Sequence, residues 1–231
     1  MFHSLLFTLM CGVHFMFLLG AKYFVSFIDD CTRVSWVYLL KNKSDVSSIF
    51  RIFHNMIQTQ FHVPVQVVRS DNGGEYLNSE LRTFFEQNGI IHQTSSPYTP
   101  QQNGIAERKN RHLLEVARSL CFAMHVPKRF WGDAICTAVY LINRVPSRVL
   151  QYQTPIQTLS QYHSIPSVLH IQPKVFGCVS YVHVHQHSRD KLDPRALKCV
   201  FVGYSISQKG YKCYYPPSGK IFVSMDVTFC E

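Results

Sequence analysis

The carboxylates of Asp71 and Glu107 are the groups in this chain whose type and spacing best suit catalysis. Asp71 lies in SDNGGEY after the apolar run VPVQVVRS, and Glu107 lies in PYTPQQNGIAERKN, with residues 72–106 between them. The Asn-Gly-Gly after Asp71 predicts a sharp turn at a strand end. The helical periodicity of residues 105–120 puts Glu107 in the first turn of a helix. Two such carboxylates can face one cleft, where their oxygens would bind divalent cations.

Strand and helix patterns alternate around these acids. The β-rich runs at 22–28 and 34–40 are joined by DDCTR, which predicts a hairpin. A helix follows, with Ser44 as its expected N-cap. This alternation predicts an α/β architecture, and the initial hairpin makes the sheet mixed. Further along, the sequence predicts a strand before Asp71, a helix at 79–87, a strand at 90–93, helices at 105–120 and 130–144, and only strands from residue 174 onward.

Composition favours a polyanionic partner. The 231 residues include 23 Lys+Arg against 14 Asp+Glu, a net charge of +9, and 46% hydrophobic residues can form a substantial core. Such charge attracts nucleic acid or an anionic membrane surface without sequence readout. The eight cysteines contain no CxxC spacing, so they predict reduced thiols in an intracellular protein.

Several segments resemble the integrases of copia-type LTR retrotransposons and, more distantly, retroviral integrases with their D,D-35-E signature. The tail, KVFGCVSYVHV followed by KLDPRALKCVFVGYSISQKGYKCY, is similar to the SH3-like module that follows this core in copia-type polyproteins. The resemblance covers nearly everything after Lys22. The matching core segments, in family order, are SFIDDCTRVSWVYLLK, VVRSDNGGEY, SSPYTPQQNGIAERKNRHLLEVARSL and FWGDAICTAVYLINRVPS.

The resemblance implies an RNase H-like mixed sheet flanked by helices and followed by a small SH3-like β-barrel. It also implies two Mg²⁺ or Mn²⁺ ions held by Asp71 and Glu107, with DNA as partner in the form of LTR ends and a target duplex. The resemblance also implies a homo-oligomer, and a nuclear location if the protein functions. No association with a membrane is expected. The expected domains are an aberrant segment at 1–21, the catalytic core at 22–147, a linker at 148–173 and the SH3-like domain at 174–231.

The resemblance further implies a DNA-contacting surface on the loop before Glu107 and on its helix. From the residues alone, composition favours an ordinary connector for the loop. For the helix, a solvated basic face is as open an interpretation as a DNA-contacting one. Contacts from such a surface to phosphates position DNA and do not read its sequence. The candidate nucleic-acid-binding residues are Asn72, Tyr98, Gln101, Asn103, Arg108, Lys109, Arg111 and Arg118.

The paired His and paired Cys of the family's N-terminal zinc module have no counterpart in this chain. His183, His185 and His187 alternate in YVHVHQHS, so they would share one strand face. A metal clip is one interpretation of this pattern. A solvated strand face is preferred, because no Cys or carboxylate completes the ligand set.

The first 21 residues do not suit a signal peptide, because only His3 precedes the apolar run and a basic residue follows it. The run is also short for a membrane span, and Gly12 and His14 interrupt it. The family has a segment like HSDVWGP here, which holds its first catalytic aspartate. Permitted codons for residues 7–17, read two bases later, encode HSDVWGPFHVS, with the aspartate codon across Leu9 and Met10. The hypothesis is therefore an out-of-frame translation of residues 1 to about 18.

Loss of that aspartate predicts impaired catalysis, because a carboxylate that bridges two metal ions cannot be spared. Asp29 and Asp30 are the nearest substitutes, but they are expected to brace the hairpin turn or pair with Arg33. Two functions stay open: a metal-dependent integrase fragment for 3′-end processing and strand transfer, and a non-catalytic nucleic-acid-binding relic or domesticated transposon protein.

Overall fold

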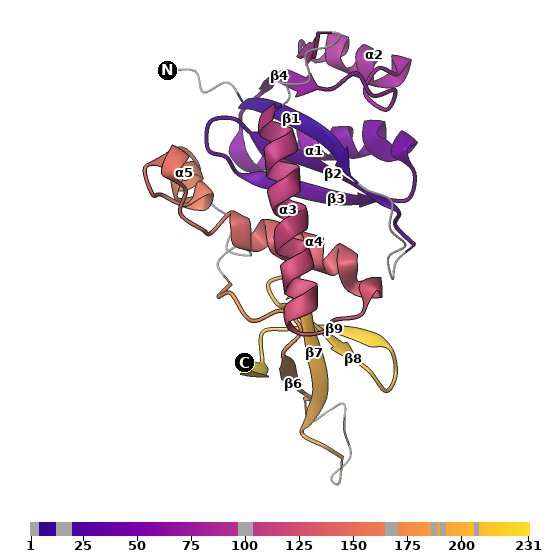
Figure 1. Ribbon diagram of the computed structural model, residues 1–231, viewed down its shortest axis with the longest axis vertical. Coiled ribbons are helices and arrows are strands. Elements are labelled where there is room, and N and C mark those ends of the chain that lie inside the picture. Colours follow the sequence, from indigo (N-terminus) through magenta and orange to yellow (C-terminus); the bar gives the residue numbers. More distant parts are fainter. Residues whose placement is uncertain are drawn as a thin grey trace. The chain divides into compact units, whose positions relative to one another are not determined.

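A computed structural model describes residues 5–12, 20–96, 104–164, 171–185, 189, 193–205 and 208–231. The chain divides into two compact units (Figure 1). The first combines residues Met1–Glu115 with Ile142–Ser164, and the second combines Val116–Leu141 with Ile165–Glu231.

The first unit is built on a five-stranded mixed sheet with the strand order β3-β2-β1-β4-β5. β1 pairs antiparallel with β2 and parallel with β4, and β5 pairs parallel with β4. The predicted hairpin and mixed sheet are thereby confirmed. The strands are β1 (Leu5–Gly12), β2 (Tyr23–Asp29), β3 (Ser35–Leu40), β4 (Val65–Ser70) and β5 (Ile91–Thr94).

The strand β1 was not predicted, because the sequence analysis assigned no secondary structure to residues 1–21. It is the central strand of the sheet, with hydrogen-bonded neighbours on both sides. A continuous apolar run without proline is typical of a strand with both faces covered. In its register, Leu9 is the Cα partner of Phe27 and Met10 is the partner of Ser26.

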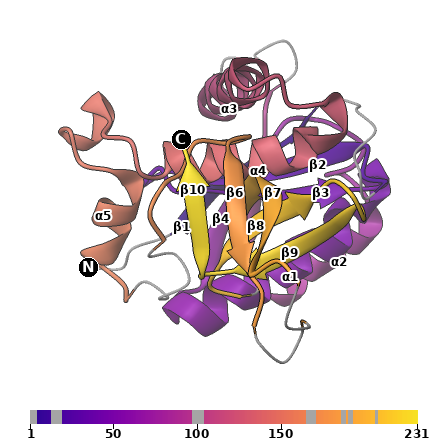
Figure 2. The same ribbon diagram turned by 90° about the horizontal axis from the view of Figure 1, so that it is seen from below.

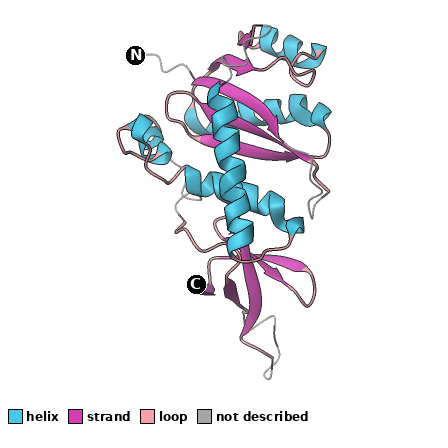
Figure 3. Cartoon of the chain, in the orientation of Figure 1, coloured by secondary structure: helices cyan, strands magenta, loops and turns pink. Residues whose placement is uncertain are grey.

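Two helices, α1 (Val46–Phe61) and α2 (Ser79–Gln87), cover one face of this sheet, and the first half of α3 lies on the other (Figures 1 and 3). An aromatic core joins α1 to the sheet, with the rings of Phe27 and Phe53 stacked at 4.1 Å between centroids. A 3₁₀ turn, η1 (Lys43–Asp45), precedes α1. The N-cap of α1 is therefore Asp45 and not Ser44, while Asn42 caps η1, where its backbone N–H donates to Asp45 Oδ2 at 2.9 Å.

The long helix α3 (Gly104–Ala123) follows the predicted periodicity. Its buried side chains Ala106, Asn110 and Leu113 recur at helical spacing. Asn110 is the polar member of this stripe, and its Oδ1 accepts a hydrogen bond from Ser26 Oγ in β2 at 2.8 Å. This contact fixes the first turns of α3 over the β1–β2 region of the sheet.

Residues 148–173, which the sequence analysis describes as a linker, contain η4 (Arg148–Leu150) and α5 (Pro155–Ser160). Thr154 caps α5 through a capping box with Gln157. Leu159 is buried in the core of the first unit. The domain boundaries given above stay predictions.

The second unit holds an antiparallel five-stranded sheet with the order β10-β6-β7-β8-β9, seen from below in Figure 2. Gly203 in β7 has a φ of +130° beside a bulge, and a Cβ there would lie 2.8 Å from Thr137 Oγ1. Only glycine fits this position. The elements are η3 (Lys128–Phe130), α4 (Trp131–Ile142), β6 (Val179–His183), β7 (Ala196–Tyr204), β8 (Tyr211–Tyr215), β9 (Lys220–Ser224) and β10 (Val227–Cys230).

The cysteines that the structure describes all carry free thiols, and four of them are buried. Within the described residues, no helix combines the length and the apolar character needed to cross a bilayer.

Asn143 fixes the edge of the first sheet. Its side chain accepts from Ser35 N at 2.9 Å and donates to Ser35 O at 2.8 Å, so it satisfies both backbone groups of one β3 residue. We expect Asn143→Ala to lower the free energy of unfolding by about 1–3 kcal/mol, because two buried backbone groups lose their partner. Chemical denaturation measures this change. Gln60→Ala, at an exposed site on α1, serves as control and should stay within about 0.5 kcal/mol of wild type.

Candidate active site

Asp71 directly follows β4 and is half-buried. Its Oδ1 accepts a hydrogen bond from Gly73 N at 3.0 Å, which closes the predicted turn. A Cβ at Gly73 would lie 3.0 Å from Asp71 Oδ1 and 3.0 Å from Glu75 Oε2, so glycine leaves room for both carboxylates in their present positions. Asn72 Nδ2 donates to Ser95 O at 2.9 Å and ties this turn to the residue after β5.

Glu107 lies in the first turn of α3 and is half-buried at the border of the buried stripe. Two neighbours in the next turn anchor this part of the helix. Asn110 binds Ser26, and Lys109 Nζ donates to the backbone carbonyl of Arg33 at 3.4 Å. Glu107 therefore sits on a helix whose position over the sheet is fixed by side-chain contacts.

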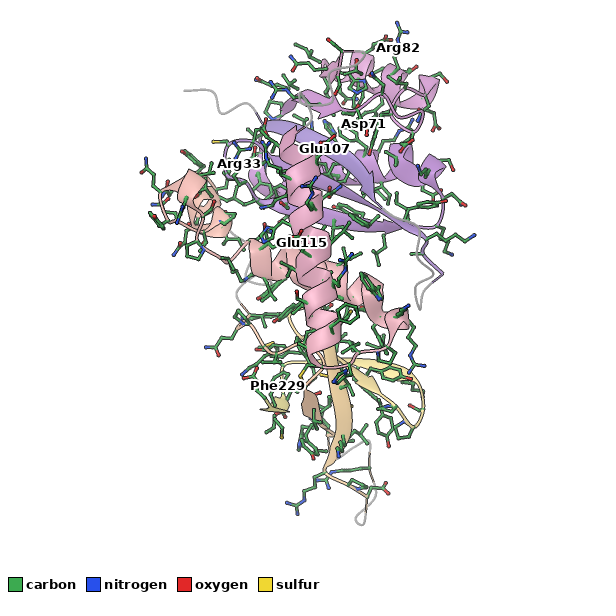
Figure 4. All side chains as sticks on the ribbon, in the orientation of Figure 1. Arg33, Asp71, Arg82, Glu107, Glu115 and Phe229 are labelled. Atoms are coloured by element: carbon green, nitrogen blue, oxygen red, sulfur yellow. The ribbon has the colours of Figure 1, made fainter. Side chains whose placement is uncertain are left out.

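The strand register brings the two acids to the same region. Thr8 of β1 is the Cα partner of Arg69 in the parallel strand β4, so position 10 comes level with Asp71, two residues further along each chain. On its other side Met10 faces Ser26, above which Asn110 lies. Asp71 and the turn that bears Glu107 thus border β1 at position 10. Figure 4 shows both side chains at this end of the sheet.

Asp29 and Asp30 are engaged in the hairpin turn. Asp29 is fully buried, and its Oδ2 accepts from Thr32 N at 2.8 Å and from Thr32 Oγ1 at 2.6 Å. Asp30 pairs with Arg33 at 3.3 Å and with Arg69 at 3.2 Å. Burial raises the pKa of Asp30, while the two guanidinium groups lower it. The predicted Asp30–Arg33 pair is confirmed.

Lys109 differs from the other basic residues of α3. Its side chain is directed to the hairpin, and burial together with the nearby Arg33 charge lowers its pKa to about 8. Arg108, Arg111 and Arg118 are exposed, as is Asn72. Three of the candidate nucleic-acid-binding residues, Tyr98, Gln101 and Asn103, lie outside the described residues.

Among the residues that the structure describes, no group of three or more His, Cys, Asp or Glu side chains is arranged to hold a metal ion. The rings of His183 and His185 lie 5.7 Å apart, edge to face. His187, the third member of the proposed clip, lies outside the described residues.

Sequence reasoning missed two residues of this region, Asn110 and Asn143. Asn110 occupies a buried position between Ala106 and Leu113, where the periodicity predicts an apolar side chain. A polar residue at such a position is a signal that it has a specific partner. Asn143, in contrast, directly follows α4, and the sequence around it gave no signal that its side chain has a specific partner.

Two families match different parts of the chain. The integrase core domain matches residues 12–100, and the retroviral polymerase SH3-like domain matches residues 178–231. Among curated relatives, the retrovirus-related Pol polyprotein from transposon TNT 1-94 of Nicotiana tabacum is 42% identical over 92% of this chain. That from transposon RE2 of Arabidopsis thaliana is 41% identical over 91%. The chain spans only 16% and 14% of the lengths of these two relatives.

Solved structures of integrases share the fold. The HTLV-2 integrase catalytic core domain, solved in complex with magnesium, aligns with a TM-score of 0.52 over 71% of this chain and 99% of its own. The simian T-cell lymphotropic virus intasome aligns with a TM-score of 0.55 over 100% of this chain and 80% of its own. Both are 16% identical in sequence, so they bear on the fold alone. The expected RNase H-like fold is thereby confirmed.

The lowered pKa of Lys109 predicts a dependence of stability on pH. Between about pH 8 and the ordinary lysine pKa of 10.5, the unfolded chain keeps a proton that the folded chain has lost, so stability rises with pH in this window. Lys109→Met should remove up to about 1.4 kcal/mol per pH unit of that slope. Denaturation curves from pH 7 to 10 measure it. Lys41→Met, at an exposed site, should keep the wild-type slope.

Proposed function

Because this chain belongs to the family of copia-type integrases, with an integrase core and a retroviral polymerase SH3-like domain, we propose that it is an integrase segment that binds DNA and is catalytically impaired. One observation carries the proposal. Asp71 and the helix turn of Glu107 border position 10 of β1, where this chain has methionine.

The residues at this site do not fit a pair of divalent ions. Asp71 and Glu107 supply one carboxylate to each ion, whereas Mg²⁺ takes near-ideal octahedral oxygen coordination and two-metal chemistry needs a shared ligand. Methionine offers no oxygen, and Asp29 and Asp30 are occupied in the hairpin. The alternative reading frame has its aspartate codon across positions 9 and 10, which supports loss of that ligand through a frame change.

Methionine at position 10 is also compatible with a second, non-catalytic function. A protein that keeps the fold and the basic surface without metal chemistry is a nucleic-acid-binding relic or a domesticated transposon protein. For both functions the DNA partner is a duplex, such as LTR ends or a target. If the chain acts as an integrase, we expect several copies to assemble and to act in the nucleus.

The DNA-binding part of the proposal rests on the exposed cations of α3. Arg108 and Arg111 are exposed on the helix that carries Glu107, while Lys109 is turned to the hairpin. Arginines on such a surface neutralise phosphates and release counterions, so binding should weaken steeply with salt.

We expect Arg111→Ala to reduce affinity for a random-sequence duplex and to lower the slope of log affinity against log salt by about one. Fluorescence anisotropy at several salt concentrations measures both quantities. Arg82→Ala is the matched control, because Arg82 is exposed on α2 and pairs with Glu86 at 3.0 Å. Equal losses in the two variants would contradict a specific role for α3.

Restoring an acid at position 10 tests the proposed impairment. We expect Met10→Asp to bind Mn²⁺ at least tenfold more tightly than wild type, because a third carboxylate then joins Asp71 and Glu107. Isothermal titration calorimetry measures the affinity and stoichiometry. A Mn²⁺-dependent strand-transfer assay then asks whether activity returns.

Leu9→Asp is the control for this substitution. Position 9 is opposite Phe27, whose ring packs against α1 on the other face of the sheet. An acid there should destabilise the protein without a gain in Mn²⁺ affinity. Wild-type protein that binds two Mn²⁺ ions and transfers strands would refute the impairment.

A further inference from the structure

An open pocket, which we call the β10 pocket, lies beside the strand β10 in the second unit. Its volume of about 530 Å³ suits a small ligand or a few side chains of a partner. The rings of Tyr211 and Phe229 line it, with centroids 4.8 Å apart and an edge-to-face arrangement, and Phe229 is labelled in Figure 4. Met225, which is 47% exposed, and Val227 add aliphatic surface. The β10 pocket therefore keeps apolar surface in contact with solvent.

Two lysines, Lys174 and Lys209, give the β10 pocket a positive charge, and no acidic residue of the described chain lines it. Lys174 is already engaged, because its Nζ lies 5.1 Å from the centroid of the Phe229 ring and 3.4 Å from Glu231 Oε2. Lys209 is exposed, and it forms no ion pair with any residue that the structure describes. The β10 pocket thus combines apolar surface with one cation that is available to an anionic partner.

The contacts of Glu231 show how a carboxylate binds next to this pocket. Its Oε1 accepts a hydrogen bond from the backbone N–H of Val175 at 2.9 Å, and its Oε2 accepts one from Lys174 Nζ at 3.4 Å. Lys209 offers a second ammonium group at the same pocket. Charge complementarity therefore points to a further carboxylate, supplied by a partner and placed at Lys209.

The lining favours a peptide over a nucleic acid. Single-stranded nucleic acids bind by stacking their bases on exposed aromatic faces and by lying along several cations. Tyr211 is only 6% exposed, and Lys174 Nζ lies over the ring of the half-buried Phe229. These rings offer little surface to a base. An aliphatic side chain that contacts Met225 and Val227, with a carboxylate next to it, matches the pocket better.

We propose that the β10 pocket binds an acidic peptide segment of a partner protein, taking an aliphatic side chain against its apolar lining and the neighbouring carboxylate at Lys209. The net charge of +9 adds long-range attraction for such a segment. The inference does not rest on the DNA binding proposed for Arg108 and Arg111, because the pocket belongs to the second unit and these arginines belong to the first.

Fluorescence anisotropy with the full chain tests the proposal. The probes are labelled octapeptides of glycine and serine that carry one leucine, methionine or valine between two aspartates, together with matched peptides that carry asparagine instead of aspartate. We expect the aspartate peptides to bind at least about threefold more tightly at low salt, and this advantage should shrink as salt is raised. Equal affinity of the two sets, or no binding by any aspartate peptide, would overturn the proposal.

Lysine variants test the role of Lys209. Lys209→Ala should weaken binding of the aspartate peptides about three- to fivefold, to the level of the asparagine peptides. Lys220→Ala is the matched control, because Lys220 is an exposed lysine on β9 that does not line the pocket. Equal losses in the two variants would show that only the overall charge of the unit attracts the peptide, against the proposal.

A second pair of variants tests the apolar lining. Met225→Ala should weaken binding of the aspartate peptides, because it removes aliphatic surface that the peptide covers. Ile221→Ala, at a 37% exposed site on β9 outside the pocket, should keep the wild-type affinity. All four side chains are exposed, so these variants should fold like the wild type. Unchanged affinity in Met225→Ala would contradict the proposed seat of the aliphatic side chain.

A labelled single strand of thymidines separates a peptide site from a nucleic-acid site. Lys209→Ala and Lys220→Ala should have the same affinity for this strand, because the β10 pocket does not hold it. A loss of strand affinity that is larger in Lys209→Ala than in Lys220→Ala would assign the pocket to nucleic acid and overturn the proposal. Neither result bears on Arg111, whose contribution to duplex binding is measured separately.

Discussion

The register of β1 between β2 and β4 is the constraint on which the candidate site depends. Its antiparallel pairing with β2 places position 10 opposite Ser26. Its parallel pairing with β4, continued by two residues, places position 10 level with Asp71. Because side chains alternate along a strand, a slip of one residue would move every group to the other face. The central strand therefore decides which residue can meet Asp71 and Glu107, although it contributes no acid of its own.

Buried polar contacts hold the surrounding elements in place. In the turn between β2 and β3, the Asp29 carboxylate accepts a hydrogen bond from the Thr32 backbone, and Asp30 forms ion pairs with Arg33 and Arg69. The backbone carbonyl of Arg33 accepts a hydrogen bond from Lys109. Asn143 completes the edge at Ser35. Each of these groups is worth little by itself, but each is costly to leave unpaired. Together they fix α3 against the sheet, and with it the position of Glu107.

The second unit combines aromatic packing with buried polar contacts. The rings of Tyr140 and Tyr204 stack with centroids 3.6 Å apart, and the Tyr140 hydroxyl donates to Ile171 O. Asp133 pairs with Lys212 at 3.8 Å, while burial raises the pKa of the acid. Buried thiols such as Cys213, whose pKa burial raises to about 11, are packing groups here and not reactive ones.

The sequence by itself determined the elements that bear Asp71 and Glu107, the helix periodicity of α3 and the family resemblance, because these are local patterns or motifs. Only the tertiary structure decided that residues 5–12 form the central strand, since an apolar run suits a strand as well as other states until neighbours pair with it. It alone joined Asn110 to Ser26 and Asn143 to Ser35. These partners are far apart in the chain, and no local preference of either residue encodes which distant group it will meet.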